Sequence, residues 1–129
     1  MPRQMSEKEA LEYIDTAQGW ATLSTIGSDG YPHSVPIGWF RVHKKIYMGC
    51  IDKTQKVINI ERNRKISICI ESGTTMRDIK GVLLRGEACI VRDTQERLAI
   101  SILAAKARGV AQQDLPKTAS PNGVYIELA

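Results

Sequence analysis

Short connections between strand-like segments are the strongest constraint on what this chain can fold into. Most of them are too short to hold the crossover helix that parallel neighbours need, so successive strands should pair antiparallel. Two glycines in the fifth segment, Gly81 and Gly86, are expected to form bulges or sharp bends that curve the sheet. We therefore expect an α+β fold, with a small closed or split antiparallel β-barrel flanked by helices. The five segments are residues 20–27, 31–42, 45–51, 65–71 and 79–92.

Capping patterns mark the starts of two helices outside this run of strands. Ser6 followed by Glu9 has the spacing of a capping box, and apolar residues then recur at helical spacing. Asp93 with Glu96 has the same spacing and begins a second helix, which is followed by a loop at 110–122 and a last strand at 123–129. The residues expected to pack this second helix against the sheet are Leu98, Ile102 and Ala105.

Two prolines interrupt the second predicted strand. Pro32 and Pro36 have no backbone N–H to give to a neighbouring strand. This strand should therefore lie at an edge of the sheet, or carry a bulge, over part of its length. Its unpaired carbonyl and amide groups would then be available to a ligand.

The third strand gives way to a helix at the most informative junction of the sequence. Asp52 followed by Gln55 has capping-box spacing, with Asp in place of Ser or Thr. The first turn of a helix has unpaired N–H groups and the positive end of the helix dipole. Here Lys53, Thr54 and Lys56 would add two ammonium groups and a hydroxyl, which together make a cradle for a phosphate. A capped surface helix whose lysines face water explains the same spacing.

The composition argues against nucleic acid and membrane as partners. The net charge is +4 over 129 residues, and one phenylalanine, two tryptophans and four tyrosines do not form a basic stripe interleaved with aromatics. No apolar run is long enough to span a bilayer, and the charged N-terminus does not resemble a signal peptide. We expect a single cytoplasmic domain over residues 1–129.

The three cysteines do not have the spacing of a metal site. Cys50, Cys69 and Cys89 lie far apart, each in an apolar strand-like segment. We expect reduced thiols that are buried or half-buried, and no metal. His33 is expected to be a hydrogen-bonded surface residue, and Trp20 is expected in the core or in an interface.

An ordered set of residues resembles the pyridoxamine 5′-phosphate oxidase-like family of FMN-binding split barrels. The set is a D-G-x-P turn, a Ser/Thr-x-Lys cluster and an Asn seven residues after that lysine. It corresponds here to Asp29, Gly30, Pro32, Thr54, Lys56 and Asn63. The resemblance implies a split barrel that binds FMN, or alternatively a deazaflavin coenzyme, between the two subunits of a homodimer. It also implies that the strand after the D-G-x-P turn hydrogen-bonds the flavin ring through its backbone.

The resemblance carries over to a specific set of cofactor-binding residues. Gly49 replaces the family's Thr and so removes one hydroxyl from the expected site. Lys56 is the residue we expect to contribute most, because it fills the family's lysine position. The full set is Val35, Pro36, Ile37, Gly38, Met48, Gly49, Lys53, Thr54, Gln55 and Lys56.

Three functions remain open on the sequence alone. The first is a flavin-dependent oxidoreductase acting on an unidentified small substrate. The second is a deazaflavin-dependent reductase of the same fold, and the third is a non-enzymatic flavin-binding or carrier protein. The chain lacks the C-terminal Arg-rich segment of the oxidases and the C-terminal histidine of haem-cleaving members, since its last histidine is His43. Neither of those activities is predicted, and no catalytic side chain is assigned. The 110–122 loop either borders the cofactor cleft or is only a surface connection.

Overall fold

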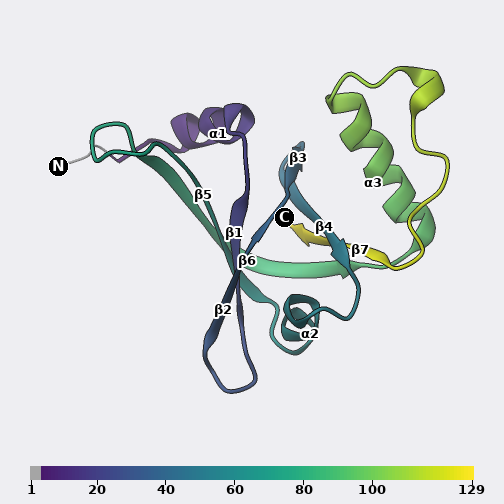
Figure 1. Cartoon of the computed structure of the whole chain (residues 1–129), viewed down its shortest axis with the longest axis horizontal. Helices are drawn as coiled ribbons and strands as arrows, with labels where there is room; N and C mark the ends of the chain where they lie inside the picture. Colours follow the sequence, from purple (N-terminus) through teal and green to yellow (C-terminus); the bar gives the residue numbers. More distant parts are fainter. Residues whose placement is uncertain (1–3) are drawn as a thin grey trace.

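The computed structural model describes residues 4–129 and contains seven strands and three α-helices in that range. Figure 1 shows the strands curling around one another, with α1 and α3 at well-separated places on the outside. In chain order the elements are α1 (Glu7–Thr16), β1 (Ala21–Ile26), β2 (Pro32–Ile37), β3 (Phe40–Val42), β4 (Lys45–Ile51), α2 (Gln55–Arg62), β5 (Lys65–Ser72), β6 (Lys80–Val91), α3 (Thr94–Ala107), a 3₁₀ turn (Gln112–Asp114) and β7 (Gly123–Leu128).

All strand pairs are antiparallel, in the order β2-β1-β5-β6-β7-β4-β3. The long strand β6 joins the two halves of the sheet, because it pairs with β5 up to Glu87 and with β7 from Ala88 onward. In Figure 1 it crosses the middle of the molecule between these two halves. The expected α+β class and curled antiparallel barrel are confirmed.

The expected second strand, residues 31–42, is in fact two strands at opposite edges of the sheet. β2 pairs only with β1, and β3 pairs only with β4. The chain changes partner at Gly38 and Trp39, which belong to neither strand. The edge position predicted from Pro32 and Pro36 is confirmed, and the division into two strands was not predicted.

The two glycines of β6 do not form bulges, so this one of the two alternatives expected from the sequence, bulges or sharp bends, is wrong. The register with β5 runs without interruption from Lys80 to Glu87, so no extra residue is inserted at Gly81 or Gly86. Gly86 instead allows close packing at the place where β6 changes partner. A Cβ there would lie 2.8 Å from Cδ1 of Leu128.

A single apolar cluster fills the barrel, and a second, smaller one lies under α3. Fully buried residues of the first include Leu23, Met48 and Ile126, each of which contributes about 1.5–3 kcal/mol by burial. The second comprises Tyr47, Val91 and Ile100. The predicted packing face of α3 is confirmed in part: Ala105 is buried, and Leu98 and Ile102 are half-buried. The residues buried with Ala105 are Arg97, Ile100 and Ala104.

The starts of α1 and α3 agree with the capping predictions. In α1, Oγ of Ser6 accepts a hydrogen bond from Glu9 N at 3.2 Å, and Glu9 Oε1 accepts one from Ser6 N at 3.1 Å. In α3, Oδ2 of Asp93 accepts a bond from Glu96 N at 2.9 Å. No helix in residues 4–129 has both the length and the apolar character needed to cross a membrane.

The cysteines are free thiols in the structure. Cys50 and Cys69 are half-buried, as expected, whereas Cys89 is exposed. Burial raises the pKa of the Cys50 thiol, which opposes its ionisation. Cys89 was expected to be buried or half-buried, and its exposure follows from the alternation of strand side chains, which turns it away from the barrel interior.

Candidate functional site

The turn from β4 into α2 differs from the predicted capping box. α2 begins at Gln55 with Thr54 as its N-cap residue, so Asp52 does not cap it. Lys53 lies between them with a φ of 64°, in the left-handed region, and this turn directs Asp52 away from the helix end. The Asp52 carboxylate accepts a hydrogen bond from the backbone N–H of Lys53 at 2.8 Å and binds a distant arginine.

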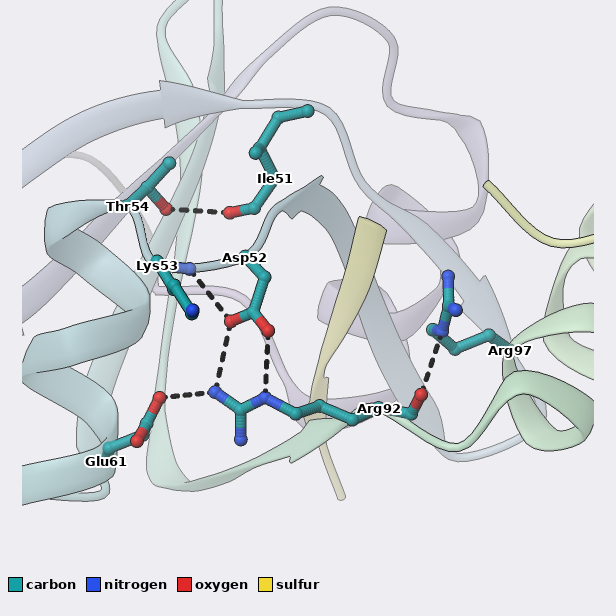
Figure 2. A network of polar contacts seen from close by, with 7 residues as sticks. All are labelled: Ile51, Asp52, Lys53, Thr54, Glu61, Arg92 and Arg97. Atoms are coloured by element: carbon teal, nitrogen blue, oxygen red, sulfur yellow. Dashed lines mark hydrogen bonds and ion pairs between the residues drawn. The ribbon is translucent and has the colours of Figure 1, made fainter. Parts of the chain in front are cut away.

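That arginine, Arg92, fixes the turn to the end of β6 (Figure 2). Its Nε and Nη2 donate to the two oxygens of Asp52 at 3.0 and 3.1 Å, and Nη2 also donates to Glu61 of α2. The side-chain hydrogen bonds from Arg92 hold the pKa of Asp52 below its usual value. Asp52 N also donates to the carbonyl of Asn122 at 2.8 Å, which ties the turn to the residue before β7.

The first turn of α2 has free backbone N–H groups. Intrahelical bonding begins with Ile58 N, which donates to Thr54 O at 3.0 Å, so the amides of residues 55–57 have no acceptor in the helix. The Thr54 side chain does not cap them, because its hydroxyl donates to Ile51 O at 3.0 Å (Figure 2). The first turn contains no acidic residue. These amides are therefore oriented to bind an anion.

The two lysines of the turn have no acidic partner within residues 4–129. Neither Lys53 nor Lys56 forms an ion pair there, whereas Arg92 is paired with two acids. Lys53 is exposed and Lys56 half-buried, and Lys56 is close enough to Cys50 to favour its thiolate. The positive charge of the helix end and of Lys56 is thus not neutralised by an ion pair, and the Asp52 carboxylate, which attracts Lys53, is itself paired with Arg92.

A buried polar network holds α2 in place against the barrel. Nε2 of Gln55 donates to Oδ1 of Asn59 at 2.8 Å, and Nδ2 of Asn59 donates to Oγ1 of Thr25 in β1 at 3.0 Å. Asn59 and Thr25 are almost completely buried. The side chain of Gln55 is held in this network by one of its two amide N–H groups, and its backbone N–H remains free for an anion.

The outer edge of β2 is rich in hydrogen-bond acceptors. Gly27 N donates to Tyr31 O at 2.8 Å, so these two residues form a hydrogen-bonded pair at the end of the β1–β2 ladder. Hydrogen-bonded and non-hydrogen-bonded pairs alternate along an antiparallel ladder. The backbone groups of Pro32, Ser34 and Pro36 therefore point away from β1. The two prolines provide carbonyls but no N–H. An edge of this kind suits a planar ligand that carries an N–H group.

The expected flavin-contact residues of β2 have different exposures. Val35 is half-buried and Ile37 buried, whereas Pro36 and Gly38 are exposed. Trp20 is 72% exposed and its ring lies beside Gly38, 3.7 Å from where a Cβ would be. Its placement in the core, one of two alternatives from the sequence, is therefore wrong.

The two expected contact residues of β4 lie on opposite faces. Met48 is completely buried in the barrel core, and Gly49 is exposed beside Tyr125. Beyond Tyr47, β4 no longer pairs with β3, so its backbone is free on that side from Met48 to Ile51. Because Met48 has no exposed surface, neither its side chain nor its backbone is accessible to a cofactor in this structure.

The structure brings β4 and the 53–56 turn together as one continuous segment, and it places β2 at the far edge of the sheet. α2 reaches toward that edge through β1, because Arg62 donates to Ile26 O and Asn59 binds Thr25. β2 is the next strand beyond β1. Residues 4–129 contain no cluster of three or more His, Cys, Asp or Glu side chains arranged for a metal ion.

Sequence reasoning missed or misplaced several residues near this site. His33 was expected to be a hydrogen-bonded surface residue, but it is half-buried and its Nδ1 has no hydrogen-bond partner within the described residues. Arg92 and Arg97 were not singled out. Arg92 lies 40 residues from Asp52, so no local spacing indicates their pairing. Arg97 could have been found from its spacing of three, four and seven residues to Ile100, Ser101 and Ala104.

The sequence model of the family described as pyridoxamine 5′-phosphate oxidase matches residues 6–127. The chain is similar to the solved structure of conserved hypothetical protein Rv2991 from Mycobacterium tuberculosis, with 24% identity over 98% of this chain and 81% of that chain and a TM-score of 0.78. No curated protein matches it.

Two further structures carry names that mention a cofactor. One is an FAD-binding protein from Mesorhizobium loti, with 16% identity over 97% of this chain and 89% of that chain and a TM-score of 0.73. The other is an F420 reductase, with 18% identity over 90% of this chain and 89% of that chain and a TM-score of 0.65. At these identities the solved structures share the fold, a split barrel of antiparallel strands flanked by helices. Together with the family match over nearly the whole chain, this fold shows that the protein belongs to the pyridoxamine 5′-phosphate oxidase family.

Proposed function

We propose that this protein binds FMN and acts as a flavin-dependent oxidoreductase on a small substrate. The observation that carries the proposal is the start of α2, where free amides and two lysines without acidic partners surround a helix end that its own residues do not cap. Family membership and the similarity to proteins named for FAD and F420 support a flavin or deazaflavin.

The residues present fit the phosphate end of such a cofactor. The phosphate would accept hydrogen bonds from the amides of residues 55–57, and Lys53 and Lys56 would neutralise its charge. The Thr54 hydroxyl donates to Ile51 O, and it would have to exchange that bond to reach the phosphate. The pairing of Asp52 with Arg92 keeps the carboxylate nearest to the site from repelling the phosphate.

The ring end of the cofactor would lie along backbone rather than against reactive side chains. We expect Val35, Pro36, Ile37 and Gly38 to border the ring, with the outward-facing carbonyl of Pro36 on the acceptor-rich edge of β2 and the backbone of the exposed Gly49 on the free edge of β4. A bound flavin supplies hydride chemistry that no side chain here offers. The protein's own role would be to position the ring and to exclude water from it.

We infer further that the protein is a homodimer with two equivalent sites. The outer face of the half-sheet β2-β1-β5-β6 has mainly small, uncharged side chains, with Leu83 62% exposed among them. Such a face can pack closely against a second copy around a two-fold axis. Its residues in register are Thr22, Ser24, Ser34, Pro36, Ser67 and Cys69, and the charged Arg85 lies opposite Ser67 on the same face. Light scattering at micromolar concentration should give twice the mass of one chain, and a monomer that still holds flavin tightly would contradict the dimer.

The function is tested by the absorbance spectrum of the purified protein and by the mass of the cofactor released on denaturation. We expect a flavin spectrum and the mass of FMN, and we expect a nicotinamide donor to bleach the bound flavin. Release of a deazaflavin would replace FMN by the alternative cofactor of the same fold, which the F420 reductase similarity favours. A protein that binds no added flavin or deazaflavin at micromolar concentration would overturn the proposal. Bound flavin that no donor reduces would favour a carrier over an enzyme.

A further inference from the structure

A cavity of about 290 Å³ lies between α3 and the strands β4 and β7. It borders the small apolar cluster through which α3 packs on the sheet. Two of its walls are glycines, Gly49 and Gly123, and the 110–122 loop closes it with Ala119 and Ser120. Its volume corresponds to roughly ten water molecules, which is enough for a small organic molecule.

Arg97 is the charged residue of this cavity, and its charge is not neutralised. Only 7% of Arg97 is exposed. Its Nε donates to the carbonyl of Arg92 at 3.0 Å (Figure 2), and its Nη1 donates to the carbonyl of Ser120 at 2.7 Å. Within residues 4–129 it has no carboxylate partner. A guanidinium has five N–H groups, so three remain without an acceptor.

The free N–H groups of Arg97 are accessible from the cavity. Among the described residues, His33 Nδ1 is the one fully buried side-chain nitrogen or oxygen that has no hydrogen-bond partner. Nη2 of Arg97 also has no partner, so it must have some exposed surface. Arg97 itself lines the cavity. Its free N–H groups are thus reachable from the cavity.

Two of the three hydroxyl groups that line the cavity, those of Ser101 and Tyr125, are already bonded within the protein. Ser101 Oγ donates to Arg97 O at 2.9 Å, and it lies 2.7 Å from the hydroxyl of Tyr125. Because Ser101 has one proton and gives it to Arg97 O, Tyr125 must donate to Ser101. Both of these protons are therefore engaged, and Arg97, together with the hydroxyl of Ser120, is left to donate to a negatively charged group.

We propose that this cavity binds a small molecule that carries a carboxylate or phosphate group, with Arg97 as the residue that binds the anion. Unpaired charge in a nearly buried site is costly, and an oxyanion that accepts two N–H bonds from the guanidinium would remove that cost. The apolar side chain of Val124 and the ring of Tyr125 would contact the rest of the molecule. The proposal does not depend on flavin binding.

A purely structural role for Arg97 explains less of this arrangement. As a clamp it joins Arg92 O to Ser120 O, and this uses two of its five N–H groups. The positive charge of the neighbouring Arg92 is already neutralised by Asp52 and Glu61. The remaining positive charge at this place therefore belongs to Arg97 and faces an open volume.

The test is calorimetric titration of benzoate, acetate and inorganic phosphate into the purified full chain. We expect benzoate to bind more tightly than acetate, because the cavity walls are partly apolar. Arg97→Gln should weaken the binding of benzoate about ten- to hundredfold, and Arg97→Lys should weaken it less. FMN affinity should be the same in the wild type and in Arg97→Gln.

A second variant keeps the test independent of the stability of Arg97→Gln. Ala119→Leu should occupy the cavity without removing either hydrogen bond of Arg97, and it should also abolish benzoate binding. Absence of benzoate binding to the wild type, or equal benzoate binding by wild type and Ala119→Leu, would overturn the proposal. Equal losses of benzoate and FMN in Arg97→Gln would contradict a separate site.

Discussion

The three helices differ in how the unpaired backbone N–H groups of their first turns are satisfied. α1 and α3 cap their own first turns, with Ser6 and Asp93 accepting bonds from backbone N–H groups. α2 does not, because Thr54 donates its hydroxyl to a carbonyl and Asp52 binds Arg92. The difference indicates where a ligand, rather than the chain, completes the hydrogen bonds of a helix end.

The charged side chains in the first turns also set α2 apart from α1 and α3. α1 has Glu7 and Glu9 in its first turn and α3 has Glu96, as the helix dipole favours. α2 has no acid there and has Lys53 and Lys56 instead. In the absence of an anion this arrangement is unfavourable, so α2 sacrifices some stability at the place where we propose the phosphate binds.

Reversing the charges of Lys53 and Lys56 should have the largest effect on the difference between α2 and the other two helices. We expect Lys53→Glu/Lys56→Glu to lower FMN affinity by about hundredfold or more, because two attractions become repulsions. The same change should stabilise the protein without ligand by about 0.3–1 kcal/mol per residue, since acids are favourable near a helix N-terminus. Titration of FMN and thermal denaturation without FMN measure the two effects. Loss of stability together with intact binding would contradict the account.

Replacing the N-cap residues of α3 and α2 should have a smaller effect, and it should differ between the two helices. Asp93→Ala should lower the free energy of unfolding by about 1 kcal/mol, because it frees Glu96 N. Thr54→Ala should lower it by less than about 0.5 kcal/mol, because Thr54 caps no amide of α2. Urea denaturation of the two variants beside the wild type measures both. Equal losses would mean that Thr54 caps α2 in solution.

The pairing of Asp52 with Arg92 should give a still smaller, pH-dependent effect. The pKa of Asp52 is lower in the folded state, so the unfolded chain binds the proton more readily. The stabilisation is therefore fully present above the unfolded value of about 3.9 and is lost as the pH falls through the lower folded value.

Asp52→Asn should accordingly show a weaker decline of stability with acid than the wild type. Asp78, whose pKa Thr75 also lowers, is present in both proteins, so the difference between the two curves reports Asp52. Denaturation curves at a series of pH values below 5 measure it. Parallel curves would show that Asp52 does not bind Arg92 in solution.

The sequence predicted features that depend on neighbouring residues and missed those that depend on distant ones. The Ser6–Glu9 and Asp93–Glu96 caps are local, and both predictions are confirmed. The edge position of β2 also follows from a local cause, the missing N–H groups of its prolines. Asp52 and Gln55 have the same capping spacing, but Arg92 competes for the carboxylate from 40 residues away.

The sequence indicated which segments could form the candidate site, but it did not indicate how their side chains are oriented. The spacing of Lys53, Thr54 and Lys56 indicated an anion-binding turn, and the structure leaves its amides free. It could not indicate that Gln55 is engaged by Asn59, or that Met48 faces the core. Those facts depend on which face of each element the barrel covers.

The most direct test of the phosphate site is a comparison of FMN with riboflavin in the wild type and in Lys56→Ala. The two ligands differ by the phosphate alone. We expect Lys56→Ala to weaken FMN about ten- to hundredfold, since a charge-assisted bond contributes roughly 1.5–3 kcal/mol. Riboflavin affinity should be nearly the same in both proteins, and the variant should fold as the wild type does. Equal affinities in all four combinations would contradict the account and leave Lys56 as a solvated surface charge.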